Sequence, residues 1–216
     1  MRYAELHCLS NFSFHRAASH PEELVAQAAQ LGYTALALTD QASVAGIVRA
    51  HAAAKDHGLK LLVGAELALE SGPTLVAWAQ NRRGYAHLCQ LITTGRLRAA
   101  KGRCRLTWED LAGHTEGLLV GVSPPATSES LSLRDLARLR ELVGPGAYLL
   151  AELHCGPHDD YRGAWLRRYA EQHGADLKAS YAYADSHSDL ALLRAVGNPV
   201  AVSPDAALLR VAMERK

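Results

Sequence analysis

The amino-acid sequence predicts an α/β fold, and it favours a closed barrel of mostly parallel strands over an open sheet. Short apolar strands alternate with segments of helical periodicity along nearly the whole chain. Residues 34–38 (TALAL) are continuously apolar, which is typical of a parallel strand covered on both faces. Polar side chains follow several strands, and a barrel would bring those strand ends together on one rim. The chain of 216 residues is long enough for one such domain.

The first third of the chain predicts a regular β-α-β-α order. A strand over residues 3–8 leads into a polar loop, and a capping box of Ser19 and Glu22 starts the first helix. Gly32 and Gly58 end two successive helices. The expected elements after the first strand are a helix at 21–31, a strand at 34–38, a helix at 43–57 and a strand at 59–63 that has Glu66 at its exit.

The same alternation continues to the last residues. Further strands are expected at residues 74–79, 117–122, 147–153, 179–184 and 199–202. Further helices are expected at residues 84–94, 107–111, 131–142, 165–173, 189–196 and 205–214. Residues 124–130 (PPATSES) have the composition of an exposed connection. These patterns together predict about eight strands in a single α/β domain over residues 1–216.

Composition excludes several classes of protein. The formal charge of +1 gives no global field that would draw the whole molecule onto nucleic acid or an anionic membrane. No apolar run is long enough to span a membrane, and no signal peptide precedes the first strand, so we expect a soluble, cytoplasmic protein. The four cysteines are scattered without a CxxC pair, which indicates reduced thiols rather than a disulfide framework. They are Cys8, Cys89, Cys104 and Cys155.

One segment is strongly basic. Residues 96–105 (RLRAAKGRCR) contain five cations, namely Arg96, Arg98, Lys101, Arg103 and Arg105. Such a run is most often solvated surface, but it could also bind the phosphate backbone of DNA. No aromatic residue is interleaved to stack on a base, so the nucleic-acid signal is weak.

The polar residues at the expected strand ends form a candidate metal site. Imidazoles and carboxylates together are the ligands that Zn²⁺, Mn²⁺ or Fe²⁺ takes in phosphoester hydrolases. If the barrel closes, its rim would gather His7, Asp40, Glu66, Glu152, His154, Asp185 and His187.

Five sequence blocks resemble a known family. They read ELHCLSNFSF, LGYTALALTD, HGLKLLVGAEL, NRRGYAHLCQLIT and ELHCGP, in this order over about residues 1–160. They resemble the PHP (polymerase and histidinol phosphatase) domain of bacterial C-family DNA polymerases, most closely that of the error-prone polymerases of DNA damage tolerance. The resemblance implies a PHP barrel of about seven strands, a rim site for up to three metal ions and, in active members, phosphoesterase or proofreading exonuclease activity. It also implies DNA, other polymerase components or DNA-repair proteins as partners.

The sequence departs from the metal pattern that the resemblance implies. Where active members have His-x-His, the chain has His7-Cys8-Leu9, and Thr39-Asp40-Gln41 replaces Thr-Asp-His. His7 and Glu66 match ligand positions, His15 falls near another, and His154 could replace one in a changed register. The loss of two imidazoles weakens a metal cluster strongly, because a partial ligand set leaves charge and geometry unsatisfied. The resemblance therefore favours a depleted site that holds little or no Zn, Mn or Mg.

The last quarter of the chain, from about residue 165, resembles a different family. Its Asp185-Ser186-His187-Ser188-Asp189 motif is similar to the Asp-Ser-x-x-Asp motif of haloacid-dehalogenase-type phosphatases of the phosphoserine phosphatase kind. In that family these acids hold Mg²⁺ opposite an aspartate nucleophile in an Asp-x-Asp motif, and this chain has no Asp-x-Asp. Asp189 could equally cap the following helix. A natural or engineered chimera is expected, with residues 165–216 completing the barrel, so that Asp185 and His187 face His7.

Three functions remain open. The first is a PHP-like domain related to error-prone DNA polymerase, without the polymerase module, in which a metal-bound hydroxide would attack a phosphodiester at most weakly. The second is a non-catalytic scaffold, in which the same residues only form hydrogen bonds. The third, phosphomonoester hydrolysis by haloacid-dehalogenase chemistry, is disfavoured by the missing nucleophile.

Overall fold

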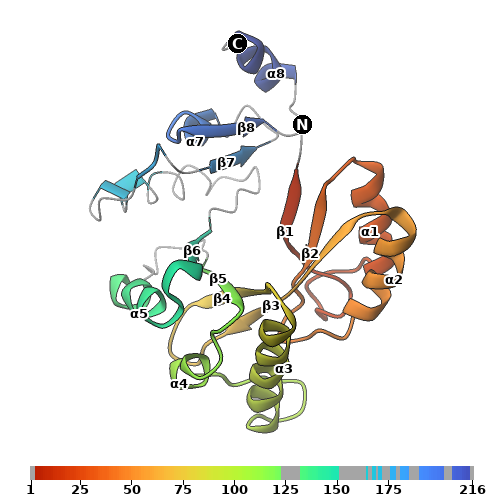
Figure 1. The fold of residues 1–216 in the computed structure, drawn as a ribbon, viewed down its shortest axis with the longest axis vertical. Helices are drawn as coiled ribbons and strands as arrows, with labels where there is room; N and C mark the ends of the chain where they lie inside the picture. The colour runs from red at the N-terminus through yellow and green to blue at the C-terminus, as the bar shows by residue number, and fades with distance from the viewer. Residues whose placement is uncertain are drawn as a thin grey trace. The chain divides into compact units, whose positions relative to one another are not determined.

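The computed structural model describes residues 3–122 and 132–150 continuously. Of the following part it describes residues 164, 167–168, 170–171, 176–178, 181–184, 190–201 and 206–214. The chain divides into two compact units, the first formed by residues 2–123 and 131–150 and the second chiefly by residues 151–216 (Figure 1). Each unit is described by itself.

The first unit is built on a six-stranded sheet with the strand order β1-β2-β3-β4-β5-β6. The strands are β1 (Ala4–Cys8), β2 (Ala35–Leu38), β3 (Lys60–Ala68), β4 (Thr74–Ala79), β5 (Leu118–Val122) and β6 (Ala147–Leu149). Strands β1, β2 and β3 pair in parallel, and so do β5 and β6. Strand β4 is antiparallel to both of its neighbours. The sheet is therefore mixed, with three parallel and two antiparallel pairings.

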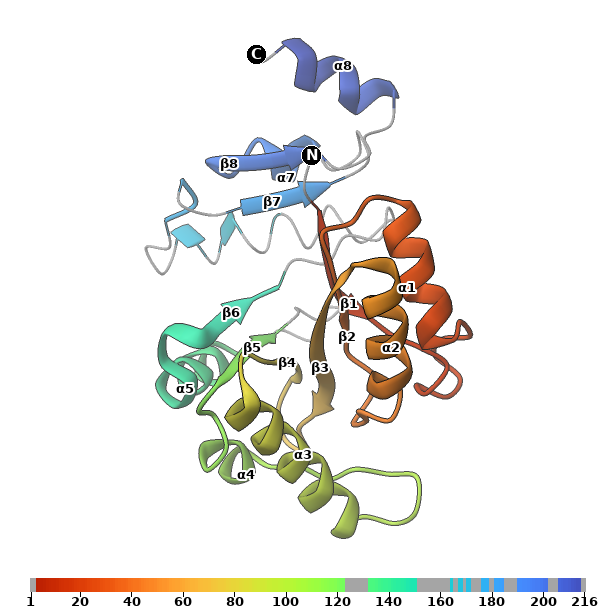
Figure 2. The ribbon, with the colours of Figure 1, turned by 45° about the vertical axis from the view of Figure 1, so that its right-hand side comes forward.

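In the described part of this unit, five α-helices and one short 3-10 helix accompany the sheet. They are α1 (Pro21–Gln30), α2 (Ile47–His57), α3 (Arg82–Leu97), α4 (Trp108–Ala112), α5 (Leu133–Val143) and η1 (Gly144–Gly146). Helices α1 and α2 lie side by side against the first strands, as Figure 2 shows. Their apolar faces, with Val25, Ile47 and Ala50, form one core with Leu36 and Leu38 of β2. Burial of this face stabilises both helices far more than intrinsic propensity does.

The sheet is curled, as a hydrogen bond of Trp78 shows. All four residues of β2 are buried, which confirms that the strand is covered on both faces. Leu36 and Leu38 pack against the helices, whereas Ala37 packs against Val76 and Trp78 on the opposite face. Nε1 of Trp78, on β4, donates to the backbone oxygen of Leu6, on β1, over 2.8 Å. A flat sheet would separate these strands by about 14 Å, so the sheet bends around this concave face.

The structure corrects several sequence expectations. Strand β3 extends to Ala68, so Glu66 lies within the strand rather than after its end. Strands β3 and β4 form an antiparallel pair, because the chain turns back directly without a helix between them. The cap of α1 is His20, whose backbone N–H donates to Glu23, and not the predicted pair of Ser19 and Glu22. Helix α2 begins four residues later than predicted, at Ile47, and α3 is longer at both ends.

The second unit contains a parallel pair of strands, β7 (Tyr181–Ala184) and β8 (Asn198–Ala201). Helix α7 (Leu190–Leu193) lies between them in the chain, and α8 (Ala206–Glu214) follows. Leu193 and Leu208 form a small core with partly buried apolar neighbours. This βαβα order agrees with the expected elements, while the likeness to haloacid-dehalogenase phosphatases stays a prediction. None of the described helices has the length and hydropathy that crossing a membrane requires.

Candidate functional site

The candidate site lies where β1, β2 and β3 run side by side. His7 is the penultimate residue of β1, and Glu66 lies on β3. Nε2 of His7 is 3.4 Å from Oε2 of Glu66, and the Glu66 side chain is only 5% exposed. The backbone of Glu66 is fixed as well, since its N–H donates to the carbonyl oxygens of Thr39 and Asp40 just after β2. The parallel pairing of the three strands thus brings the predicted histidine and glutamate together.

Asp40 has a different environment. This residue is almost completely buried, and its carboxylate accepts three hydrogen bonds from the loop that follows β1. The backbone N–H and hydroxyl of Ser10 donate to it, each over 2.7 Å, and the hydroxyl of Ser13 donates over 2.6 Å. The Ser13 hydroxyl also accepts from the N–H of Gln41. Asp40 therefore anchors the loop of residues 9–17, because a buried carboxylate is stabilised by such donors.

The anchored loop carries an arginine to Glu66. Hydrogen bonds from the N–H groups of Arg16 and Ala17 to the oxygen of Ser13 form a tight turn. Within it His15 has a φ of 62°, the left-handed conformation that residues other than glycine seldom adopt. The guanidinium of Arg16 forms an ion pair with Oε1 of Glu66. One oxygen of Glu66 thus faces Arg16 and the other faces His7.

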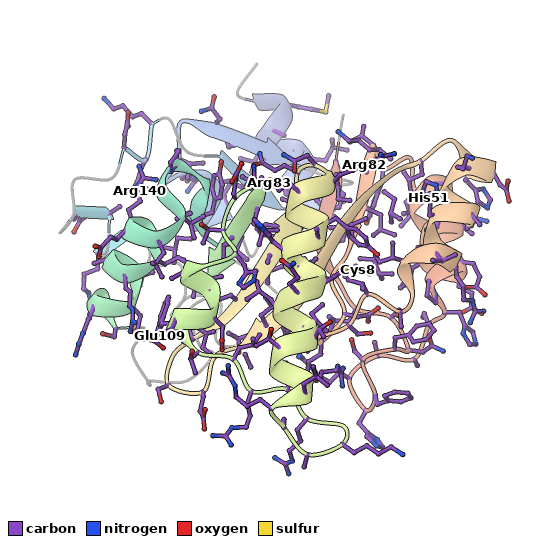
Figure 3. The ribbon with its side chains drawn as sticks, turned by 60° about the horizontal axis from the view of Figure 1, so that its bottom comes forward. Cys8, His51, Arg82, Arg83, Glu109 and Arg140 are labelled. Carbon is purple, nitrogen blue, oxygen red and sulfur yellow. The ribbon has the colours of Figure 1, made fainter. Side chains whose placement is uncertain are left out.

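The electrostatics agree with this arrangement. Burial by itself would raise the pKa of Glu66, but hydrogen bonds with His7 and Arg16 outweigh it and hold the pKa below its ordinary value. The carboxylate is therefore ionised at neutral pH. Burial, together with the charges of Glu5 and Asp40, raises the pKa of Cys8 to about 12. Cys8, labelled in Figure 3, is consequently a neutral thiol at neutral pH.

The predicted ligands are distributed unevenly. His7 and Glu66 are in contact, Asp40 holds the loop, and His15 is exposed to solvent. Five further predicted ligands lie outside the described residues, namely Glu152, His154, Asp185, His187 and Asp189. Sequence reasoning missed Arg16, Ser10 and Ser13, although two hydroxyls three residues apart directly after a strand were a usable sign of a loop held by an acid.

The donor side chains that the structure describes do not by themselves fit a metal centre. No three side chains of His, Cys, Asp or Glu come together as metal ligands in the described part of the chain. Among the described candidate ligands, His7 and Glu66 are in contact, and Glu66 already pairs with a permanent cation, the guanidinium of Arg16. A divalent ion at this pair would be repelled by that guanidinium, and two ligands alone would hold it only weakly.

Most cations of the predicted basic segment bind other residues of the fold. Arg96 donates twice to the backbone oxygen of Ala42, over 3.0 and 2.8 Å. Arg98 pairs with Asp110 through two hydrogen bonds, and Arg105 pairs with Glu70. Lys101 and Arg103 are exposed, and neither forms an ion pair with another residue of the described ranges. DNA binding by this segment stays a prediction, with these two cations the most available.

Comparison with known proteins identifies the family. The family model described as the PHP domain matches residues 5–152, which is more than half of the chain. The chain belongs to the PHP domain family. This confirms the family resemblance of the N-terminal blocks and agrees with the α/β fold and its curled, mostly parallel sheet.

Curated relatives of this PHP domain are error-prone DNA polymerases. That of Rhodopirellula baltica is 44% identical over 179 residues, which cover 77% of this chain and 16% of the relative. That of Pseudomonas paraeruginosa is 52% identical over 161 residues, which cover 74% of this chain and 15% of the relative. The chain thus spans about a sixth of the length of these proteins.

Two solved structures share the fold. One is a protein from Bifidobacterium adolescentis assigned as a metal-dependent phosphoesterase, with a TM-score of 0.59, 18% identity and coverage of 81% of this chain and 85% of that one. The other is an amidohydrolase from Chromobacterium violaceum with bound sulfate and no metal, with a TM-score of 0.54, 18% identity and coverage of 83% and 85%. At this identity the likeness concerns the fold alone.

Proposed function

We propose that this PHP domain serves error-prone DNA synthesis in DNA damage tolerance, as a module with a depleted metal site and at most weak metal-dependent phosphoesterase activity. Its similarity to error-prone polymerases from several bacteria supports the biological setting. Polymerase activity and DNA-repair partners belong to the same proposal, since the chain corresponds to only a small part of those relatives.

One observation carries the proposal of a depleted site. Of the candidate ligands that the structure describes, only His7 and Glu66 lie together. The carboxylate of Asp40, a third candidate, already accepts three hydrogen bonds from Ser10 and Ser13. Withdrawing it from them to bind a metal ion would leave buried donors unsatisfied, which is costly.

A purely structural role is the second candidate function, and a specific contact favours it. Arg16 forms an ion pair with the buried Glu66 and supplies it with a positive charge. The site then stabilises the ends of three strands and the loop of residues 9–17, and it performs no hydrolysis.

Metal analysis combined with two hydrolysis assays tests the proposal. We expect purified protein to contain well below one equivalent of zinc or manganese. We also expect its hydrolysis of bis(p-nitrophenyl) phosphate, with or without Mn²⁺, to stay within a few-fold of the rate of the His7→Ala variant. Stoichiometric metal with diesterase activity that disappears in His7→Ala would contradict the depleted site. Hydrolysis of p-nitrophenyl phosphate alone would instead favour a phosphomonoesterase.

A further inference from the structure

The buried carboxylate of Glu66 requires a positive partner. Glu66 pairs with Val76 of the neighbouring strand β4, and on its other side it forms a β-bridge with Gln41. Its backbone therefore cannot move away from the interior. Its side chain is 5% exposed and forms an ion pair with the guanidinium of Arg16, so it is buried as an anion. An isolated buried anion is strongly unfavourable and persists only beside a compensating charge.

Arg16 is the permanent cation at this position. The guanidinium stays charged at every accessible pH, whereas His7 is charged only when it is protonated. Its delivery is built into the fold, since Asp40 holds Ser10 and Ser13, and the turn through Ser13 places Arg16 over β3. Asp40, the two serines that it holds and the turn through Ser13 thus act together to place one positive charge beside Glu66.

We propose that Arg16 is a resident cation that takes over, in this chain, the electrostatic role of a metal ion at the pair of His7 and Glu66. A guanidinium and a divalent cation carry charge of the same sign and compete for the same carboxylate. Removal of Arg16 therefore takes the permanent cation away from Glu66, and at the same time it removes the charge that repels a divalent ion from the pair. This inference rests on the proposed metal-poor site and adds the group that replaces the metal.

Thermal unfolding of Arg16→Gln, with and without Zn²⁺, tests the inference. We expect Arg16→Gln to lower Tm by about 5 °C or more, because it strands a buried charge. Millimolar Zn²⁺ should restore several degrees in this variant and shift the wild type by less than about 1 °C. The double variant with Glu66→Gln should recover at least half of the loss and show no zinc response.

Arg49→Gln is the matched control. Arg49 also pairs with a glutamate, Glu22, but the two side chains are 48% and 39% exposed. Exposed pairs contribute little, so Tm should change by no more than about 2 °C, without a zinc response.

The outcomes test the proposed function and the resident-cation inference separately. If Arg16→Gln is as stable as the wild type, or its zinc response survives the replacement of Glu66, the resident-cation inference is wrong. If Arg16→Gln fails to fold, the double variant must fold, and its failure would also contradict the inference. Stoichiometric zinc in the wild type would overturn the proposed function, whereas a missing zinc response in Arg16→Gln overturns only this inference.

Discussion

His15 stands directly before Arg16 with a φ of 62°, and its side chain is exposed. For a residue with a Cβ atom the left-handed conformation costs about 1–2 kcal/mol. The loop tolerates this cost because the hydrogen bonds of Asp40 to Ser10 and Ser13 define its path. The conformation turns the chain back so that Arg16 reaches Glu66. His15 therefore contributes through its backbone.

Replacing His15 by glycine should leave the protein equally stable or raise its free energy of unfolding by up to about 1 kcal/mol. Glycine adopts positive φ without steric cost, which outweighs its greater entropy loss on folding. Urea denaturation measures the difference. The matched control is His51→Gly, an exposed histidine within α2 (Figure 3), which should destabilise by about 1 kcal/mol. Equal losses in both variants would show that the His15 side chain matters.

Sequence reasoning recovered part of the site at this scale. It selected His7 and Glu66, because chemistry-bearing residues near the ends of parallel strands stand out from an apolar background. It could not select Arg16, since an arginine in a polar loop looks the same whether it is solvated or paired. That distinction depends on which carboxylate lies across the loop, and the carboxylate is 50 residues away in the chain.

At the scale of elements, most strands and helices were predicted, whereas the direction of β4 was not recognised. An apolar strand of period two has the same pattern in either direction, so the turn between Ala68 and Thr74 alone could indicate the antiparallel return. The residues of that turn include Gly72 and Pro73, which are ordinary signals for a reversal. Helix boundaries shifted by a few residues because caps depend on local hydrogen bonds such as that of Asn81 with Gly84.

Gly84 allows the start of α3 to approach the chain just before β5. A Cβ atom at this position would lie 1.9 Å from the backbone oxygen of Gly117, and backbone cannot yield as a side chain can. We expect Gly84→Ala to lower the free energy of unfolding by about 3 kcal/mol. Gly113→Ala, where nothing lies within 4 Å, should be neutral or slightly stabilising. Urea denaturation checks both, and a mild effect at Gly84 would contradict this close packing.

Helix α4 should contribute an acid-sensitive part of the stability. Hydrogen bonds from Arg98 outweigh partial burial and, with those of Thr107, lower the pKa of Asp110. A carboxyl group whose pKa is lower in the folded state stabilises above its unfolded pKa, near 3.8. This contribution disappears as the pH falls through the folded pKa.

Asp110→Asn should therefore be less stable than the wild type at pH 7, and the difference should shrink as the pH falls from about 5 to 2. Urea denaturation at a series of pH values measures it. The comparison with the wild type removes the contributions of the other carboxylates. A difference that stays constant with pH would contradict the assigned role of Asp110.

For the whole molecule, we expect removal of divalent metal to leave stability unchanged. Arg16 already compensates Glu66, so EDTA should shift Tm by less than about 1 °C. Differential scanning calorimetry with and without EDTA checks this. A fall of several degrees that zinc reverses would reveal a structural metal ion.

The sequence predicted the family of the domain better than the range of residues that belongs to it. Five blocks in order were sufficient for the PHP family, and the family match ends at residue 152. The error-prone polymerase of Dechloromonas aromatica nevertheless matches 82% of the chain, a larger share than residues 1–160 make up. Closure of a barrel by the tail stays a prediction, because strand periodicity does not determine which strands pair at the two edges of a sheet.

The bond from Trp78 to the oxygen of Leu6 joins atoms 72 residues apart. During synthesis the N-terminal strand leaves the ribosome long before its indole partner does, with α1, β2, α2 and β3 emerging in between. The hydrogen bond that closes the concave face can therefore form only after the fourth strand has been translated. Until that moment a nascent chain must keep Leu6 and its neighbours from pairing elsewhere.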